Sequence, residues 1–178
     1  MDDLSLHILD IAENSLNAGA TLVDIRINEQ PQDNLLIIDI EDNGRGMDQA
    51  SAKAAWDTGM TTKRGKRFGL GLPFLAEAAE AAGGEVTIES KPDEGTLVQV
   101  TMEYNHFDRK PLGDLVATFM VLAAGYPLAD FLFTHSKSDR EYTIATWEIK
   151  RDLGENTLSS ARAISTLREA LLRGETGL

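Results

Sequence analysis

The chain contains no cysteine, which excludes disulfide bonds, thiolate nucleophiles and cysteine-based metal sites. It has no apolar run approaching the about 18 residues of a membrane-spanning helix, and its acidic start is unlike a secretory signal. Basic residues are scarce: 17 Lys and Arg stand against 29 Asp and Glu, and the net charge of -12 repels a phosphate backbone. We therefore expect a cytoplasmic protein whose partners are proteins or small molecules, with no nucleic acid and no membrane among them.

The chain has 178 residues, of which 42% are apolar, so it is long enough to bury a core. This length predicts one domain, or one domain with a small appendage. The composition gives no indication of disorder.

One stretch, residues 38–47, combines an apolar strand with a carboxylate and two glycines. Asp42 follows the apolar residues, and Gly44 and Gly46 come shortly after it. A carboxylate at a strand end can accept a hydrogen bond from an exocyclic amine such as that of adenine, and glycines let the backbone approach a flat base. The motif predicts a nucleotide pocket, although an isolated motif of this kind also fits a polar turn after a buried strand.

Residues 4–18 have the periodicity of an amphipathic helix, and Gly19 is placed as its stop signal. The apolar positions are Leu4, Ile8, Ile11, Ala12 and Leu16. The opposite face is predicted to carry His7, Asp10, Glu13, Asn14 and Asn17. Such a stripe usually faces water, but asparagine is a poor helix former, so a ligand on this side is a second interpretation.

The rest of the first hundred residues predicts two hairpins and two further helices. The expected strands are residues 21–28, 35–41, 85–89 and 96–103, and the expected helices are a short one after Asp48, to about residue 57, and one over residues 73–82. This order predicts an α/β (α+β) two-layer sandwich, in which helices cover one face of a mixed, mostly antiparallel sheet.

Residues 58–67 show no apolar periodicity and contain four of the basic residues, so we interpret this segment as a mobile lid. It runs directly into a glycine-containing segment, where Gly69 and Gly71 precede the helix that Pro73 begins. Backbone N–H groups at a helix start bind anions, so phosphate contact is predicted here. A solvated surface is the alternative for the charges.

Five motifs in this order resemble those of the GHKL superfamily of ATPases, which includes gyrase, a heat-shock chaperone, histidine kinases, MutL and the related anti-sigma-factor kinases. They are Asp10-x-x-x-Asn14, Asp42-x-Gly44-x-Gly46-Met47, Thr61-Thr62-Lys63, Gly69-Leu70-Gly71-Leu72 and Gly95-Thr96. Residues 12–21 resemble MutL most and residues 61–96 a histidine kinase. The resemblance covers about residues 4–103 and implies the Bergerat ATP-binding fold with ATP and Mg²⁺.

The resemblance also implies roles for single residues. The implied nucleotide-binding set is Asn14, Asn17, Asp42, Gly44, Gly46, Met47, Lys63, Gly69, Leu70, Gly71, Leu72 and Thr96. Asn14 would be the Mg²⁺ ligand, because an amide oxygen is a hard donor. Asp42 would read the adenine amino group, Met47 would pack against the base, and Lys63 would reach a phosphate from the lid.

Asp10 is implied as the catalytic residue, because it lies one helical turn before Asn14, where related ATPases place a glutamate base. Its side chain is one methylene shorter, so an activated water or hydroxyl must come closer, or Asp10 joins the magnesium shell instead. Two features depart from histidine kinases. No helix pair carrying a phosphoacceptor histidine precedes the motifs, and the lid lacks their paired phenylalanines, so we expect His7 to be only a polar helix position beside the pocket.

Residues 105–178 lie outside the resemblance and are predicted to form a small C-terminal α/β extension, possibly a partner-docking module, after a nucleotide-binding domain at residues 1–104. A linker is expected at residues 104–111, a helix from about Leu112 to Ala123, a hairpin of residues 131–135 and 142–150, and a last helix near residues 158–172. The extension shows no catalytic cluster of its own.

Three functions follow from these expectations. The first is a stand-alone protein kinase, of the anti-sigma or histidine-kinase-like type, that transfers the γ-phosphate of ATP to a protein partner. The alternative is a MutL- or chaperone-like ATPase switch, in which ATP closes the lid and drives formation of a homodimer. The third is a nucleotide-binding regulator with negligible turnover.

Overall fold

A computed structural model describes residues 3–55 and 71–178 of the chain and places six strands in one sheet. The strands are β1 (Leu22–Gln30), β2 (Leu35–Asp42), β3 (Glu85–Lys91), β4 (Gly95–Glu103), β5 (Asp130–Lys137) and β6 (Arg140–Ala145). Their order across the sheet is β3-β4-β2-β1-β5-β6. Only the β1–β5 pair is parallel, so the sheet is mixed and mostly antiparallel, as predicted.

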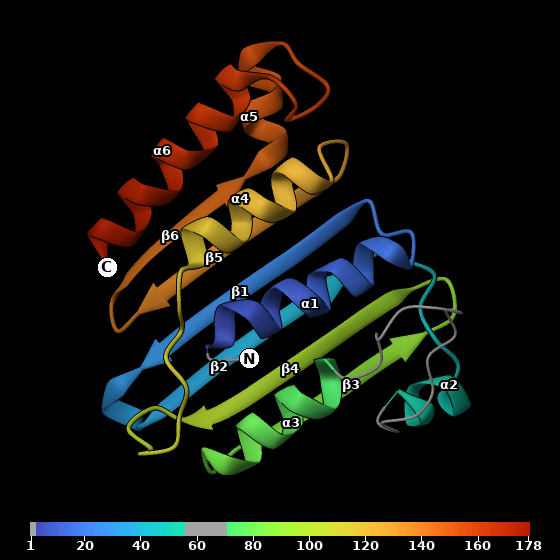
Figure 1. The fold of residues 1–178 in the computed structure, drawn as a ribbon, viewed down its shortest axis with the longest axis vertical. Coiled ribbons are helices and arrows are strands. Elements are labelled where there is room, and N and C mark those ends of the chain that lie inside the picture. The colour runs from blue at the N-terminus through green and yellow to red at the C-terminus, as the bar shows by residue number, and fades with distance from the viewer. Residues whose placement is uncertain (1–2, 56–70) are drawn as a thin grey trace.

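Helices cover one face of this sheet (Figure 1). They are α1 (Leu4–Asn17), α3 (Gly71–Ala81), α4 (Leu115–Gly125), α5 (Thr146–Leu153) and α6 (Ala161–Gly177), while the short α2 (Gln49–Ala54) lies at one end. Strand residues alternate accordingly: in β1, Val23, Ile25 and Ile27 are buried, and the residues between them are half-buried. The predicted two-layer sandwich is confirmed. No helix in the described ranges has both the length and the apolar character needed to cross a membrane.

Both predicted hairpins form. A 3-10 turn, η1 (Pro31–Asp33), joins β1 to β2, and Asn34 closes it in the left-handed conformation at φ 52°. Asp93 has the same role between β3 and β4, at φ 62°. Asparagine and aspartate tolerate this conformation better than other non-glycine residues, which explains their use at these turns.

The C-terminal extension continues the sheet instead of forming one of its own. β5 pairs in parallel with β1 from Leu22↔Asp130 to Glu29↔Lys137, and one hydrophobic cluster runs under α1, α4 and α6. Residues on both sides of the predicted domain boundary, between residues 104 and 105, therefore share one hydrophobic core. A separate docking role for residues 105–178 stays a prediction.

The prediction of a strand through residue 150 is wrong, because β6 ends at Ala145 and α5 begins at Thr146. The Thr146 hydroxyl accepts a hydrogen bond from the backbone N–H of Phe131 at 2.8 Å. One turn later, the buried Lys150 ammonium donates to the carbonyl of Ala129 at 2.8 Å. Both hydrogen bonds are made with residues that are distant in the sequence. Residues 146 and 150 lie on the same side of a helix, so helix formation allows both bonds, and local strand propensity does not reveal this.

Candidate functional site

The carboxylate of Asp42, at the end of β2, is buried and held by two hydrogen bonds. The hydroxyl of Ser15 on α1 donates to Oδ2 at 2.6 Å, and the backbone N–H of Gly44 donates to Oδ1 at 2.8 Å. Asp42 is 9% exposed, and its orientation is fixed from both sides. The contact with Ser15 ties the helix of the site to the sheet, while the contact with Gly44 shapes the loop that follows.

Two glycines let the loop after Asp42 pack directly on the β3–β4 hairpin. Gly46 has φ +60°, and a Cβ there would lie 1.8 Å from the carbonyl oxygen of Lys91. Gly95 has φ +97°, and a Cβ there would lie 1.9 Å from the carbonyl oxygen of Asp42. Neither position accommodates a side chain, so glycine is required at both by conformation and by space.

A serine that the sequence analysis did not single out connects the loop to the predicted nucleotide residues. The hydroxyl of Ser90 accepts from the backbone N–H of Met47 at 2.8 Å and lies 2.8 Å from the hydroxyl of Thr96. Thr96 in turn stands opposite Asp42 in the β2–β4 register. Asp42, Met47 and Thr96 all line one cavity of about 650 Å³, so the structure brings these three predicted residues together.

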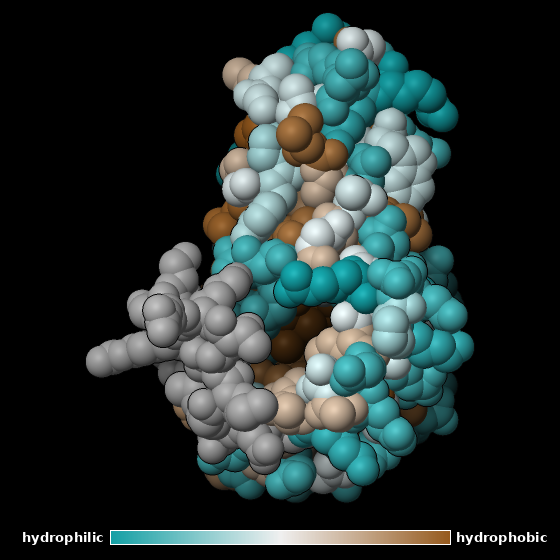
Figure 2. All heavy atoms as spheres, turned by 90° about the vertical axis from the view of Figure 1, so that its right-hand side faces the viewer, coloured by the Kyte–Doolittle hydropathy of each residue, from teal (hydrophilic) through white to brown (hydrophobic). Residues whose placement is uncertain are grey.

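The side of the molecule that carries this end of the sheet is hollowed. Figure 2 views the right-hand side of Figure 1, where α2 and the end of α1 lie, and shows a depression with an apolar floor and hydrophilic residues above it. A flat apolar base and a charged phosphate chain need this combination of surfaces.

Asp10 and Gly71 meet where α1 passes the first residue of α3. A Cβ at Gly71 would lie 1.5 Å from Oδ2 of Asp10, so the start of α3 packs directly on this carboxylate. Burial, followed by repulsion from Glu13, raises the pKa of Asp10 above its ordinary value. Asn14 lies one turn further along α1 with an exposed side chain. The predicted base and the predicted magnesium ligand are therefore neighbours beside a helix start.

The remaining predicted site residues are placed less directly. The amide of Asn17 is exposed and donates to the carbonyl of Glu13 on its own helix at 2.7 Å. Leu72, in the first turn of α3, packs against the hydrophobic core. The other predicted contacts, Lys63, Gly69 and Leu70, lie outside the described residues, as does the predicted lid.

The prediction that His7 is a polar position beside the pocket is wrong. The residue is 1% exposed, and within the described ranges neither ring nitrogen has a hydrogen-bond partner. Burial, together with the nearby charge of Lys110, lowers the pKa of His7 to about 4, so the ring is neutral at physiological pH. His7 and Asn14 share one face of the helical wheel, but His7 is buried whereas Asn14, two turns later on the same face, is exposed.

Ser15 and Ser90 are residues of the candidate site that sequence reasoning missed. A signal for Ser15 was present: it lies on the same helical face as Ile8 and Ile11, and a serine on a buried face needs a hydrogen-bond partner. No comparable signal exists for Ser90, because its contacts with Met47 and Thr96 depend on how the loop meets the hairpin.

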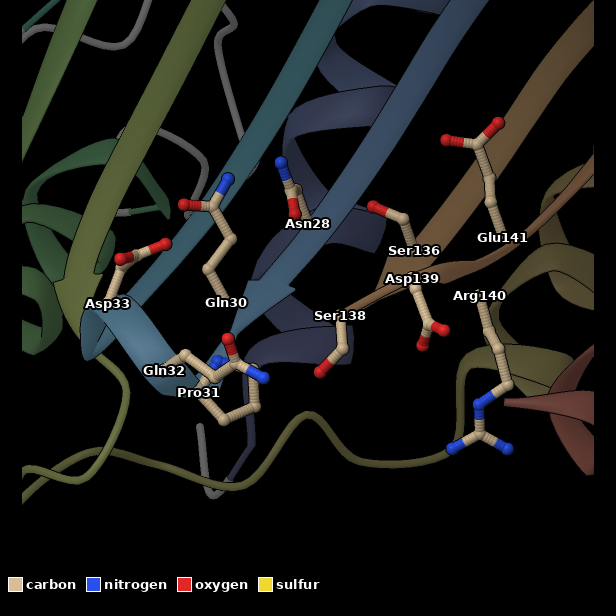
Figure 3. Close-up of a pocket in the computed structure, with 10 residues that line it drawn as sticks. All are labelled: Asn28, Gln30, Pro31, Gln32, Asp33, Ser136, Ser138, Asp139, Arg140 and Glu141. Carbon is tan, nitrogen blue, oxygen red and sulfur yellow. The ribbon is translucent and has the colours of Figure 1, made fainter.

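A second cavity, of about 820 Å³, lies near the β1–β2 and β5–β6 turns (Figure 3). Its lining residues are Asn28, Gln30, Pro31, Gln32, Asp33, Ser136, Ser138, Asp139, Arg140 and Glu141. Three of them are acidic and only Arg140 is basic, which disfavours a phosphate. None of the predicted site residues lines it, so the two cavities are separate.

Comparison with known proteins finds a family match in the first part of the chain. A family model described as histidine kinase-, DNA gyrase B-, and HSP90-like ATPase matches residues 2–106. The sensor histidine kinase CitA of Klebsiella pneumoniae is 28% identical over 107 residues, covering 54% of this chain and 19% of that protein. The DNA mismatch repair protein MutL of Gemmatimonas aurantiaca is 36% identical over 104 residues, covering 52% and 16%. The chain thus spans less than a fifth of the length of these relatives.

Solved structures show the same fold. The MutL ATPase domain of Aquifex aeolicus, in complex with ADP, superposes with a TM-score of 0.52 at 14% identity. The superposition covers 87% of this chain and 70% of the other, so it extends beyond the residues that match the family model. The N-terminal domain of a DNA repair protein gives a TM-score of 0.50 at 16% identity, covering 82% and 52%.

Proposed function

The chain belongs to the histidine kinase-, DNA gyrase B- and HSP90-like ATPase family, and on this basis we propose that it binds ATP with Mg²⁺ and transfers the γ-phosphate to a protein partner. The observation that carries the proposal is the buried carboxylate of Asp42, fixed by Ser15 and by the backbone of Gly44 beside a cavity. Each carboxylate oxygen has two lone pairs, and each of these contacts occupies one. A further lone pair is therefore free to accept a hydrogen bond from the amino group of adenine.

The residues of α1 suit the phosphate end of the nucleotide. No three His, Asp or Glu side chains converge on a metal position within residues 3–55 and 71–178. That agrees with Mg²⁺, which proteins hold through one or two side chains together with the phosphates. Asn14 would supply the amide oxygen, and the ion would supply the positive charge that phosphoryl transfer requires.

Asp10 is the residue that we expect to accept a proton. Burial and the charge of Glu13 raise the pKa of Asp10, and a raised pKa makes a carboxylate a stronger base. Its contact with Gly71 places it at the start of α3, the helix terminus where phosphates are expected. From this position it would deprotonate the attacking hydroxyl of a protein substrate.

A second candidate is an ATPase switch, in which Asp10 activates water and hydrolysis resets a conformational change. Direct connection between the site and the C-terminal extension favours it. The end of α4 lies beside two residues of α1. Burial and then the charge of Glu13 raise the pKa of Tyr126, and a hydrogen bond from Asn17 opposes this rise. β5 also pairs with β1 along its length. A movement at α1 would therefore reach the extension directly.

Calorimetric titration with a non-hydrolysable ATP analogue tests binding first. We expect binding that requires Mg²⁺ and is lost in Asp42→Asn, because the new amide can present a donor to the adenine donor. Asp39→Asn is the matched control, since Asp39 lies on the same strand but accepts from Gln99 on the open face of the sheet. Unchanged affinity in Asp42→Asn would remove Asp42 from its role.

Transfer from γ-labelled ATP then separates the functions. Label on a co-purified protein, lost in Asp10→Ala, supports the kinase. Release of labelled phosphate together with ATP-dependent dimerisation, and no transfer, would replace the kinase by the switch. Binding without transfer or release would leave a nucleotide-binding regulator.

A further inference from the structure

Helix α4 is apolar on all sides, and part of its surface is uncovered. Thr118 is its only residue with a polar side chain, and this residue is buried. The outer side is formed by Ala117, Val121 and Ala124, all exposed, with Val121 at 52%. A helix that is hydrophobic all round is normally buried on all sides, so the exposed apolar side of α4 is unusual.

The helices on either side extend this apolar surface. α4 packs between α1 and α6, and each neighbour contributes one exposed leucine: Leu6 is 41% exposed and Leu172 is 40% exposed. We use the name α4 face for Leu6, Ala117, Val121, Ala124 and Leu172. Figure 1 shows the three helices side by side on the same face of the sheet. Apolar side chains that are exposed on neighbouring helices are typical of an interaction site.

The size of the surface suits a protein partner. Three helices about 10 Å apart and about 20 Å long offer on the order of 600 Å². A standard interface buries about 800 Å² on each partner, which the rims of the outer helices can supply. A small molecule would need a concave site, and the outer side of a helix layer is not concave.

We propose that the α4 face binds a second copy of this chain, related by a two-fold axis that runs parallel to α4. The charges at its borders are the reason. Glu13 lies on α1, where its charge acts on Tyr126 at the end of α4, and the exposed Arg168 lies on α6, one turn before Leu172. Rotation about this axis exchanges the α1 side with the α6 side. Glu13 of each copy then faces Arg168 of the other, and the leucines Leu6 and Leu172 exchange in the same way.

A surface with acid at one border and base at the other is self-complementary. A uniformly basic partner would place like charge against Arg168, and a uniformly acidic one would do so against Glu13. The net charge of -12 on each copy opposes association at long range, so apolar burial at the α4 face must provide the attraction. Association should accordingly be reversible, independent of nucleotide, and strongest in buffer with enough salt to screen the net charge.

Sedimentation equilibrium of the full chain without nucleotide, over a wide concentration series, is the test. We expect a monomer–dimer equilibrium that Val121→Glu weakens by about tenfold or more, because it places a carboxylate in the apolar centre. Phe107→Glu is the control, since Phe107 is 98% exposed in the segment before α4 and the substitution also replaces an exposed apolar side chain by a carboxylate. The control should dimerise like the unmodified chain.

A charge exchange tests the geometry itself. Glu13→Arg alone should weaken the dimer, and Glu13→Arg combined with Arg168→Glu should restore it, which a merely destabilised fold would not do. A chain that stays monomeric at every concentration, or a Val121→Glu variant that dimerises normally, would overturn the proposal. ATP-analogue titration of Val121→Glu separates this result from the proposed function, because the variant should bind nucleotide whether or not it dimerises.

Discussion

Replacing His135 by Gln should remove a pH dependence of stability that the fold builds into its C-terminal end. His135, on β5, is 3% exposed and lies between two carboxylates. Its Nε2 is 3.1 Å from Glu29 on β1, and its Nδ1 is 2.9 Å from Glu175 on α6. Tyr142 on β6 also donates to Glu175, and Lys137 lies 3.5 Å from Glu29. The cluster therefore joins three strands to the last turn of α6.

The direction of the effect follows from the pKa shifts. Burial opposes the charge on His135, but hydrogen bonds with Glu175 and Glu29 outweigh it and hold the pKa of His135 above 6.5. Its contribution to stability is complete below 6.5 and is lost as pH rises through the folded-state pKa. Burial also opposes the charges on the two carboxylates, yet contacts with His135 keep both of their pKa values below 4.5. Their contribution is complete above 4.5 and is lost at lower pH, so the cluster stabilises most between 4.5 and 6.5.

Removing one partner of a buried ion pair costs about 3–5 kcal/mol. Glu175 is 28% exposed and lies near the chain end, and the new glutamine can still donate one hydrogen bond, so about 2–3 kcal/mol is expected for His135→Gln near pH 5.5. With a urea m-value of about 2 kcal/mol per M, the midpoint should fall by about 1–1.5 M. The deficit should shrink at higher pH, because the unmodified chain loses the charged imidazole there.

Urea unfolding across this pH range checks the prediction. His106→Gln is the control, because His106 lies outside the cluster, beside Asp108 at the surface. Parallel pH profiles for His135→Gln and the unmodified chain would refute the reasoning, since the imidazole would then carry no charge that the cluster uses.

Three further predictions concern the nucleotide site. Ser15→Ala should lower the free energy of unfolding by about 1–3 kcal/mol, because the buried Asp42 carboxylate loses one hydrogen-bond donor. The variant should also bind the ATP analogue more weakly in calorimetry. Unchanged binding would show that Ser15 does not orient the Asp42 carboxylate. Gly46→Ala should lower the thermal midpoint and displace the loop, since its Cβ would collide with the carbonyl of Lys91; a crystal structure with an unmoved loop would contradict this. Turnover should rise with pH through the elevated pKa of Asp10 and lose that dependence in Asp10→Asn, which a pH–rate profile will show, and an unaltered profile would dismiss Asp10 as the base.

Periodic patterns in the sequence were sufficient for the elements of the first hundred residues. The apolar spacing of Leu4, Ile8 and Ile11 predicted α1, and the alternation of Val23, Ile25 and Ile27 predicted β1. The loop from Asp42 to Gly46 was predictable for a different reason, because its glycines are required by backbone conformation. These signals depend only on residues close together in the sequence, so they can be recognised without knowledge of the fold.

Contacts between distant segments were not predictable in this way. His7 and Asn14 share a helical face, yet only His7 is buried, because burial along this face depends on which other elements pack against it. Residues 146–150 have strand-like composition but form α5, where Thr146 and Lys150 bond to the segment before β5 and to its first strand residues.

By itself, the sequence determined the two-layer class, the hairpins, and the carboxylate–glycine loop of the candidate site, since each depends on residues close together in the chain. The tertiary structure alone decided that Ser15 orients Asp42, that Gly71 lies on Asp10, and that β5 joins the same sheet as β1. It also left the outer side of α4 uncovered, because α4 lies between α1 and α6 with its buried face turned to the sheet. Such contacts depend on how whole elements pack, and packing is a property of all the side chains of a core together.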